Sequence, residues 1–151
     1  MIFVDSSAWI GLMVTRDRHH EEARAAYEQL RETRHSLVTS DYVLNETYTR
    51  VRALTQNWRL LHRAHEYFLQ AEEKASLLVH WTDKTIFDAA RDLFMSWKDQ
   101  NFSFVDCVSF VTARKLGIQE CFSFDRDFLI AGLRLYQKKP VSRGSPPAKM
   151  T

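Results

Sequence analysis

The alternation of short apolar runs with longer amphipathic stretches constrains the fold of this chain more than any other feature. Runs of strand length rich in apolar residues occur at 2–4, 36–39, 77–80 and 121–124, with a further candidate at 133–136. Strands that alternate with helices and are apolar on both faces are typical of a parallel sheet with helices on each side. The pattern therefore predicts an α/β fold around a central, mostly parallel sheet of about five strands.

The helices between these runs are predicted from apolar residues that recur at every third or fourth position. The clearest helix spans 83–98, after the start signal Thr82-Asp83. The stretch 104–116 is apolar on nearly every side, which predicts a buried helix, and Gly117 is a suitable stop signal for it. The remaining predicted helices cover 18–33, 41–54 and 57–71.

The length of 151 residues indicates one domain, which we assign to residues 1–137. All three prolines lie in the last twelve residues, so 138–151 is predicted to be a flexible tail outside the fold. No apolar run approaches the roughly 18 residues of a membrane span, and the N-terminus lacks the layout of a signal peptide. Cys107 and Cys121 match neither a disulfide framework nor a zinc site. These features predict a cytoplasmic protein.

Acidic residues stand where two of the predicted strands end. Asp5 follows the run 2–4, and Asp125 follows the run 121–124. Ligands bind open parallel sheets at the carboxyl ends of the strands, so both carboxylates are expected at the same edge. Carboxylates that converge on one point repel each other unless a cation joins them. The sequence therefore suggests a divalent-metal site, and with it a reaction on phosphate.

Two of the acids have alternative explanations as helix caps. Asp5 could cap a helix that begins near Ala8, but the serines at 6–7 could cap it equally well, so Asp5 is not needed for that role. Ser103 and Asp106 have the spacing of a capping box, with Asp in place of Glu or Gln. Against this, an ionised carboxylate in a helix that is apolar on nearly every side should face a group that keeps it charged. For Asp106 both interpretations stay open.

The other acids are less clear from pattern alone. Either Asp125 or Asp127 could start a short helix at 126–133, and only one of them is expected to be a ligand. We choose Asp125, the residue directly after the strand. Glu46 lies about 140° around its helix from the apolar stripe. A solvated pair with Arg50 at i+4 explains Glu46 without any functional role.

The charge of the chain neither predicts nor excludes a nucleic-acid partner. The net charge is +2, from 21 basic and 19 acidic side chains. Most of the basic residues are expected to be solvated helix faces, although several could border a groove: Arg50, Arg52, Arg59, Arg63, Arg114, Lys115 and Arg126.

Four segments, taken in order, resemble the PIN-domain family and, within it, the VapC-like toxin group. The opening segment 2–9 resembles the first strand of that family with its first acid and adjoining hydroxyl residue. The segment 44–46 resembles the motif of the second acid. The segments 103–107 and 122–128 closely resemble the motifs of the third and fourth acids. The resemblance covers roughly residues 1–136.

The resemblance implies a compact three-layer α/β/α sandwich, usually homodimeric, that cleaves single-stranded RNA with Mg²⁺ or Mn²⁺. It also implies four catalytic metal ligands, which bind directly or through water: Asp5, Glu46, Asp106 and Asp125. For Glu46 this overrides the surface pair that periodicity favours. Ser6 and Ser123 stand where the family often has Thr, and they are implied to orient a carboxylate or water.

The function implied by the resemblance is that of a toxin endoribonuclease. A small antitoxin would hold the toxin inactive by placing a segment in the acidic groove. Two other functions stay open: a non-toxic RNA-processing PIN nuclease, and a catalytically silent PIN module that binds RNA or a partner. The intact set of four acids argues against the silent module.

Overall fold

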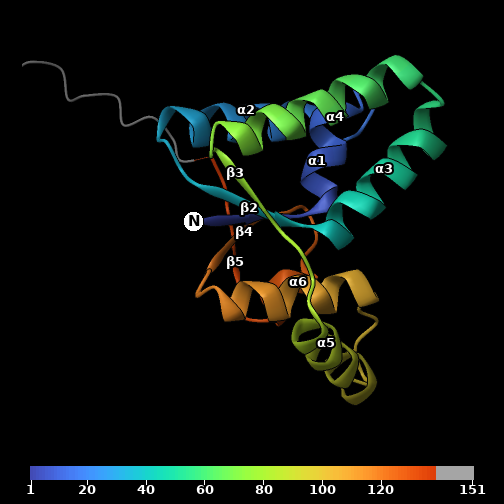
Figure 1. Cartoon of the computed structure of the whole chain (residues 1–151), viewed down its shortest axis with the longest axis vertical. Helices are drawn as coiled ribbons and strands as arrows, with labels where there is room; N and C mark the ends of the chain where they lie inside the picture. Colours follow the sequence, from blue (N-terminus) through green and yellow to red (C-terminus); the bar gives the residue numbers. More distant parts are fainter. Residues whose placement is uncertain (139–151) are drawn as a thin grey trace, which may run out of the picture.

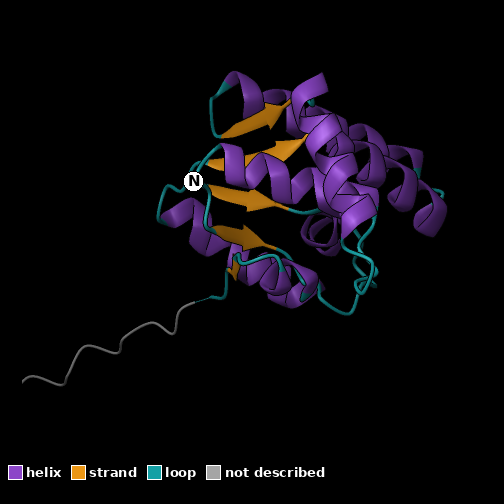
Figure 2. Ribbon diagram, turned by 90° about the horizontal axis from the view of Figure 1, so that it is seen from below, coloured by secondary structure: helices purple, strands orange, loops and turns teal. Residues whose placement is uncertain are grey.

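A five-stranded, all-parallel sheet forms the centre of the computed structural model, which describes residues 1–138. The predicted tail at 138–151 lies outside the described residues except for its first position. The strands run in the spatial order β3-β2-β1-β4-β5, and Figure 2 shows the longer ones as arrows that point the same way. Their bounds are β1 Ile2–Val4, β2 Leu37–Ser40, β3 Leu77–His80, β4 Glu120–Phe122 and β5 Arg134–Leu135.

Helices cover both faces of the sheet, so the predicted three-layer α/β/α sandwich is confirmed (Figure 1). One face carries α1 (Ser6–Met13), α2 (His20–Glu32), α3 (Asp41–Thr55) and α4 (Trp58–Glu73). The opposite face carries α5 (Lys84–Ser96) and α6 (Phe104–Lys115). The short helix α7 (Asp127–Ile130) connects β4 to β5.

Local signals in the sequence explain where these elements start and stop. Asp83 begins α5 by accepting a hydrogen bond from the backbone N–H of Ile86, as the start signal predicts. Gly117 adopts a φ of 67° directly after α6, a left-handed conformation that glycine adopts without steric cost. The helix that Gly117 follows, α6, is buried over most of its surface, as its sequence predicts.

The core explains why the strands can be so short. All three residues of β1 are at most 1% exposed, and Cys121 and Phe122 of β4 are equally buried. Strands covered on both faces in this way read as continuous apolar runs. Both cysteines are free and buried. Among residues 1–138, no helix is both long and apolar enough to cross a membrane.

One predicted strand boundary is wrong in a way that matters for the site. The run 121–124 ends as a strand at Phe122, so Asp125 does not follow the strand directly. After Phe122, two serine hydroxyls accept hydrogen bonds from backbone N–H groups that a neighbouring strand would otherwise bind. Phe124 N donates to Ser7 Oγ at 3.0 Å, and Asp125 N donates to Ser123 Oγ at 3.0 Å. The backbone therefore leaves the sheet two residues earlier than the apolar run predicts.

The strand order reverses between β1 and β4. The connections from β1 run through β2 to β3 on one side, and the chain then returns to the other side of β1 as β4. Such a reversal is the switch point at which open α/β sheets bind ligands. Asp5 and the loop that holds Asp125 both leave the sheet at this point.

Candidate metal centre

Asp5 is a buried carboxylate, 4% exposed, at the end of β1. Its Oδ2 accepts hydrogen bonds from Ser7 Oγ at 2.8 Å, Ser123 Oγ at 3.0 Å and Ser7 N at 3.3 Å. The expectation that Asp5 is not needed as a cap is wrong, because Asp5 is the N-cap of α1, which begins at Ser6 and not near Ala8. Burial raises the pKa of the Asp5 carboxyl, and the bonds from Ser7 and Ser123 oppose that rise.

Asp106 both caps a helix and faces the other acids, so its two interpretations are compatible. Ser103 N donates to Asp106 Oδ2 at 2.8 Å and Asp106 N donates to Ser103 Oγ at 3.1 Å, which completes the capping box of α6. Burial raises the pKa of the Asp106 carboxyl to about 6, and the charges of Asp5 and Asp125 add to the rise. A cap on an isolated helix would not experience those charges.

Asp125 and Asp127 both belong to the same acidic group as Asp106. One carboxylate oxygen from each of the three residues lies within 4.8 Å of the others. Asp127 N donates to Asp125 Oδ1 at 2.9 Å, which curls the loop so that both side chains face Asp106. Burial and the charge of Asp125 raise the pKa of Asp127. The structure therefore brings Asp127 into the group, although the sequence favoured Asp125 alone.

Glu46 lies outside this group of three, but it does not pair with Arg50. Ser6 Oγ donates to Glu46 Oε2 at 2.6 Å, and no ion pair joins Glu46 to Arg50 among residues 1–138. This hydrogen bond holds Glu46 on the side of α3 that faces α1. Ser6 directly follows Asp5, so Glu46 lies near the acidic group. The simple explanation of Glu46 as half of a surface pair with Arg50 is wrong.

The serines connect the acids to one another. Ser123 Oγ donates to Asp5 and accepts from the backbone N–H of Asp125, so it joins the ends of β1 and β4. Ser7 is a residue that sequence reasoning missed: its hydroxyl donates to Asp5, lies 3.1 Å from Ser123 Oγ and accepts from Phe124 N. Only its position directly after the Asp5-Ser6 pair could have indicated this role.

The donor set fits a hard divalent cation. The group offers only oxygen ligands, and carboxylates of this kind suit Mg²⁺, Mn²⁺ or Ca²⁺ more than zinc or copper. The raised pKa values of Asp5, Asp106 and Asp127 show that the folded chain alone does not stabilise these carboxylates in the ionised form. A bound cation would remove that cost, so the residues present fit a metal centre.

Adding Mn²⁺ is expected to raise the melting temperature more at about pH 7.5 than at about pH 5. Folding raises the pKa of Asp106 from 3.8 to about 6, so the folded state binds the proton of this carboxyl more tightly than the unfolded state does. The resulting stabilisation is complete below about pH 4 and is lost as the pH rises through about 6. Above that pH a cation relieves the repulsion, whereas below it the cation must displace a proton. Thermal unfolding with and without Mn²⁺ measures the difference, and equal rises at both pH values would contradict it.

Comparisons with known proteins identify the family and the fold. The family model described as "PIN domain" matches residues 2–132. The 23S rRNA-specific endonuclease VapC20 of Mycobacterium tuberculosis is 32% identical over 132 residues, which span 87% of this chain and 95% of that protein. The crystal structure of VapC20, described as a sarcin-ricin loop cleaving toxin, superposes with a TM-score of 0.79. That superposition covers 91% of this chain and 99% of VapC20, at 29% identity.

More distant solved structures share the fold. FitAcB from Neisseria gonorrhoeae superposes with a TM-score of 0.62 at 17% identity and covers 91% of this chain. VapBC-1 from nontypeable Haemophilus influenzae superposes with a TM-score of 0.62 at 18% identity, over 91% of this chain and 98% of that chain. At these identities the likeness concerns the architecture alone.

Proposed function

The chain belongs to the PIN-domain family, and from this membership we propose that it is a VapC-like toxin endoribonuclease that cleaves single-stranded or looped RNA. The observation that carries the proposal is the convergence of Asp106, Asp125 and Asp127 beside buried Asp5, at the switch point of the sheet. The similarity to VapC20, an endonuclease specific for 23S rRNA, supports RNA as the substrate. In this proposal the nuclease domain spans residues 1–137.

The proposed ligands of the divalent metal, bound directly or through water, are Asp5, Glu46, Asp106 and Asp125. We add Asp127 to the proposal because one of its carboxylate oxygens lies within 4.8 Å of those of Asp106 and Asp125. We propose Mg²⁺ or Mn²⁺ as the ion. When bound, such an ion supplies an activated water and neutralises charge on the phosphate and on the leaving oxygen. Ser123 holds Asp5 in one orientation, and Ser6 does the same for Glu46.

The acids also explain why the metal would be needed for substrate binding. Without a cation, the carboxylates of Asp5, Asp106 and Asp125 repel a phosphodiester. The same carboxylates would hold a bound cation, and the positive charge of that cation would attract the phosphate. The proposed partners follow from the toxin assignment: a small antitoxin that blocks this acidic site, and a second copy of the chain in a homodimer.

Purified protein is expected to cut a looped RNA oligonucleotide in Mg²⁺ or Mn²⁺ and to stop cutting when EDTA is added. The reason is that the acidic group alone repels the substrate and cannot activate water. Cleavage followed on denaturing gels, with the metal restored after chelation as the control, measures this. Undiminished cutting in EDTA would disprove a metal-dependent nuclease. Growth arrest on induction of the protein in a host without an antitoxin separates a toxin from an RNA-processing enzyme, which would leave growth normal.

A further inference from the structure

A groove of about 540 Å³ opens beside the acidic site. Ser7 and Asp125 of the site form part of its lining, and three arginines form another part. Arg18 comes from the connection between α1 and α2, Arg50 from α3 and Arg126 from the loop after β4. These segments are far apart in the sequence, so the fold alone gathers the arginines in one groove.

The three arginines form no ion pair within residues 1–138. All three are exposed, and none has a carboxylate oxygen within 4.0 Å among residues 1–138. The two acids that line the groove, Asp17 and Asp125, accept hydrogen bonds from backbone N–H groups and form no ion pair with these arginines. Asp17 Oδ1 accepts from His19 N at 2.8 Å, and Asp125 Oδ1 accepts from Asp127 N at 2.9 Å. Arg18 donates its Nε–H to His19, but none of the three guanidinium groups pairs with a carboxylate in the described part of the chain, so each can bind an anion, and a phosphate suits their geometry well.

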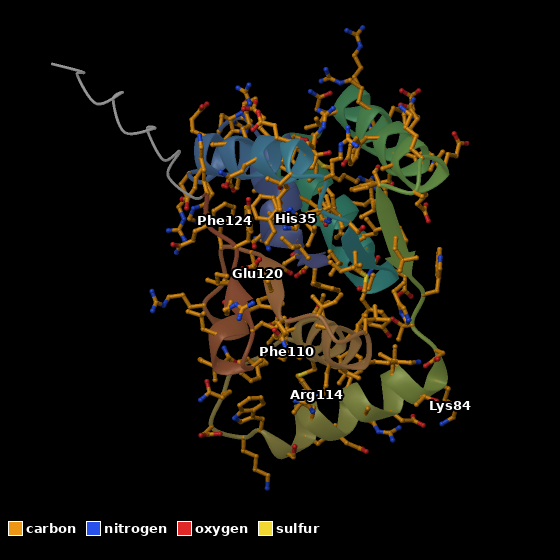
Figure 3. The ribbon with its side chains drawn as sticks, turned by 90° about the vertical axis from the view of Figure 1, so that its left-hand side faces the viewer. His35, Lys84, Phe110, Arg114, Glu120 and Phe124 are labelled. Carbon is orange, nitrogen blue, oxygen red and sulfur yellow. The ribbon has the colours of Figure 1, made fainter. Side chains whose placement is uncertain are left out.

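A chain of contacts connects the groove to the acidic site. Arg18 Nε donates to His19 Nε2 at 3.1 Å, and the His19 ring stacks on Phe124 at 4.2 Å between centroids, with 5° between the planes. Figure 3 labels Phe124 in the loop after β4; its ring edge lies close to Gly11 of α1. The backbone N–H of Phe124 donates to Ser7, which in turn holds Asp5. The position of Arg18 is thus tied to the position of the catalytic acids.

We propose that this groove binds the phosphodiester backbone of the RNA strand on one side of the cleaved bond, through Arg18, Arg50 and Arg126. His19, stacked on Phe124, is a positioning residue that holds Arg18. The inference rests on the proposed function and adds to it the path of the substrate. A cluster of acids repels a polyanion, and the arginines attract the flanking phosphates and so bring the scissile bond to the metal.

Binding of a dye-labelled single-stranded RNA with a cleavage-resistant phosphorothioate backbone, which keeps the phosphate charges, to the full wild-type chain tests the groove without cleavage. In Mg²⁺, each of R18Q, R50Q and R126Q is expected to weaken binding about five- to tenfold, and to lower the slope of log K against log salt by about 0.7. R59Q is the matched control, because it removes the same charge from an exposed position outside the groove. It is expected to leave both quantities unchanged.

The positioning role of His19 has its own readout. H19A is expected to weaken RNA binding when Arg18 is present and to cause no further loss in an R18Q background, because His19 acts through Arg18. Equal losses in both backgrounds would overturn that role.

These experiments can contradict the RNA-binding role of the groove and the nuclease function independently of each other. If the three arginine variants bind RNA like R59Q with an unchanged salt slope, the groove is not the RNA path, even if the wild type cuts RNA. An antitoxin segment as the true occupant would give that same result and overturn the proposal. If the wild type cuts no RNA but the arginine variants lose affinity, the groove stands as an RNA site and the nuclease function fails.

Discussion

Replacing Asp106 with Asn is expected to lower the rate of metal-dependent RNA cleavage by on the order of a thousandfold, the scale on which removal of one group that stabilises developing charge lowers kcat. Asp106 is the member of the acidic group whose pKa responds to the charges of both Asp5 and Asp125, so it lies where the charges converge. The Asn side chain loses the charge needed for a cation. Its amide oxygen can still accept the bond from Ser103 N, so the cap of α6 is retained.

The matched control for this substitution is Asp99→Asn, in an exposed position between α5 and α6. It is expected to cut RNA at the wild-type rate. Glu46→Gln should cost less than Asp106→Asn, about tenfold, because Glu46 lies outside the group of three acids. Rates from single-turnover cleavage with Mn²⁺, alongside thermal unfolding of each variant, give the comparison. Wild-type cleavage by the Asp106→Asn chain would show that the metal centre is assigned to the wrong residues.

Replacing Trp9 with Ala is expected to lower the free energy of unfolding by about 3–5 kcal/mol. Trp9 is 1% exposed, and its ring meets Phe68 edge-on at 5.1 Å between centroids. Its indole Nε1 donates to Thr39 Oγ1 at 3.3 Å, and Thr39 Oγ1 donates to Val4 O at 3.0 Å. The substitution leaves a large cavity between α1 and α4 and removes a donor from a buried hydroxyl.

The same substitution at an exposed tryptophan isolates the effect of burial. Trp81 is 72% exposed, and Trp81→Ala is expected to change the free energy of unfolding by no more than about 0.5 kcal/mol. Urea unfolding followed by circular dichroism measures both variants. The Trp9 variant should also melt on the order of 10 °C below the wild type. Similar urea midpoints for the two variants would mean that Trp9 does not have the central packing role described above.

The acids differ in how far the sequence could predict their surroundings. Asp5 and Asp125 were expected at one edge of the sheet because both follow apolar runs, and the parallel topology brings their segments together. The assignment of these acids as ligands stays a prediction. The setting of Asp106 in an apolar helix indicated a partner, and its pKa of about 6 reflects burial and the charges of Asp5 and Asp125.

Glu46 and Asp127 show what periodicity misses. A helical wheel measures only which side of a helix faces the core, so a carboxylate that bonds to a neighbouring helix is predicted to be solvated. The partner of Glu46 is Ser6, 40 residues away in the chain. The sequence favours Asp125 over Asp127 because Asp125 comes directly after the apolar run. The hydrogen bond from Asp127 N to Asp125 Oδ1 turns both side chains toward Asp106.

The sequence by itself determined the strand and helix alternation, the parallel sheet and the edge at which the strand-end acids emerge. These features follow from local apolar patterns and from the way that parallel strands align. Only the tertiary structure decided which acids meet, and that Arg18, Arg50 and Arg126 share a groove with them. The reason is physical: these contacts depend on how α3, α6 and the loop after β4 pack around the switch point, and packing between distant segments leaves no periodic trace in any one of them.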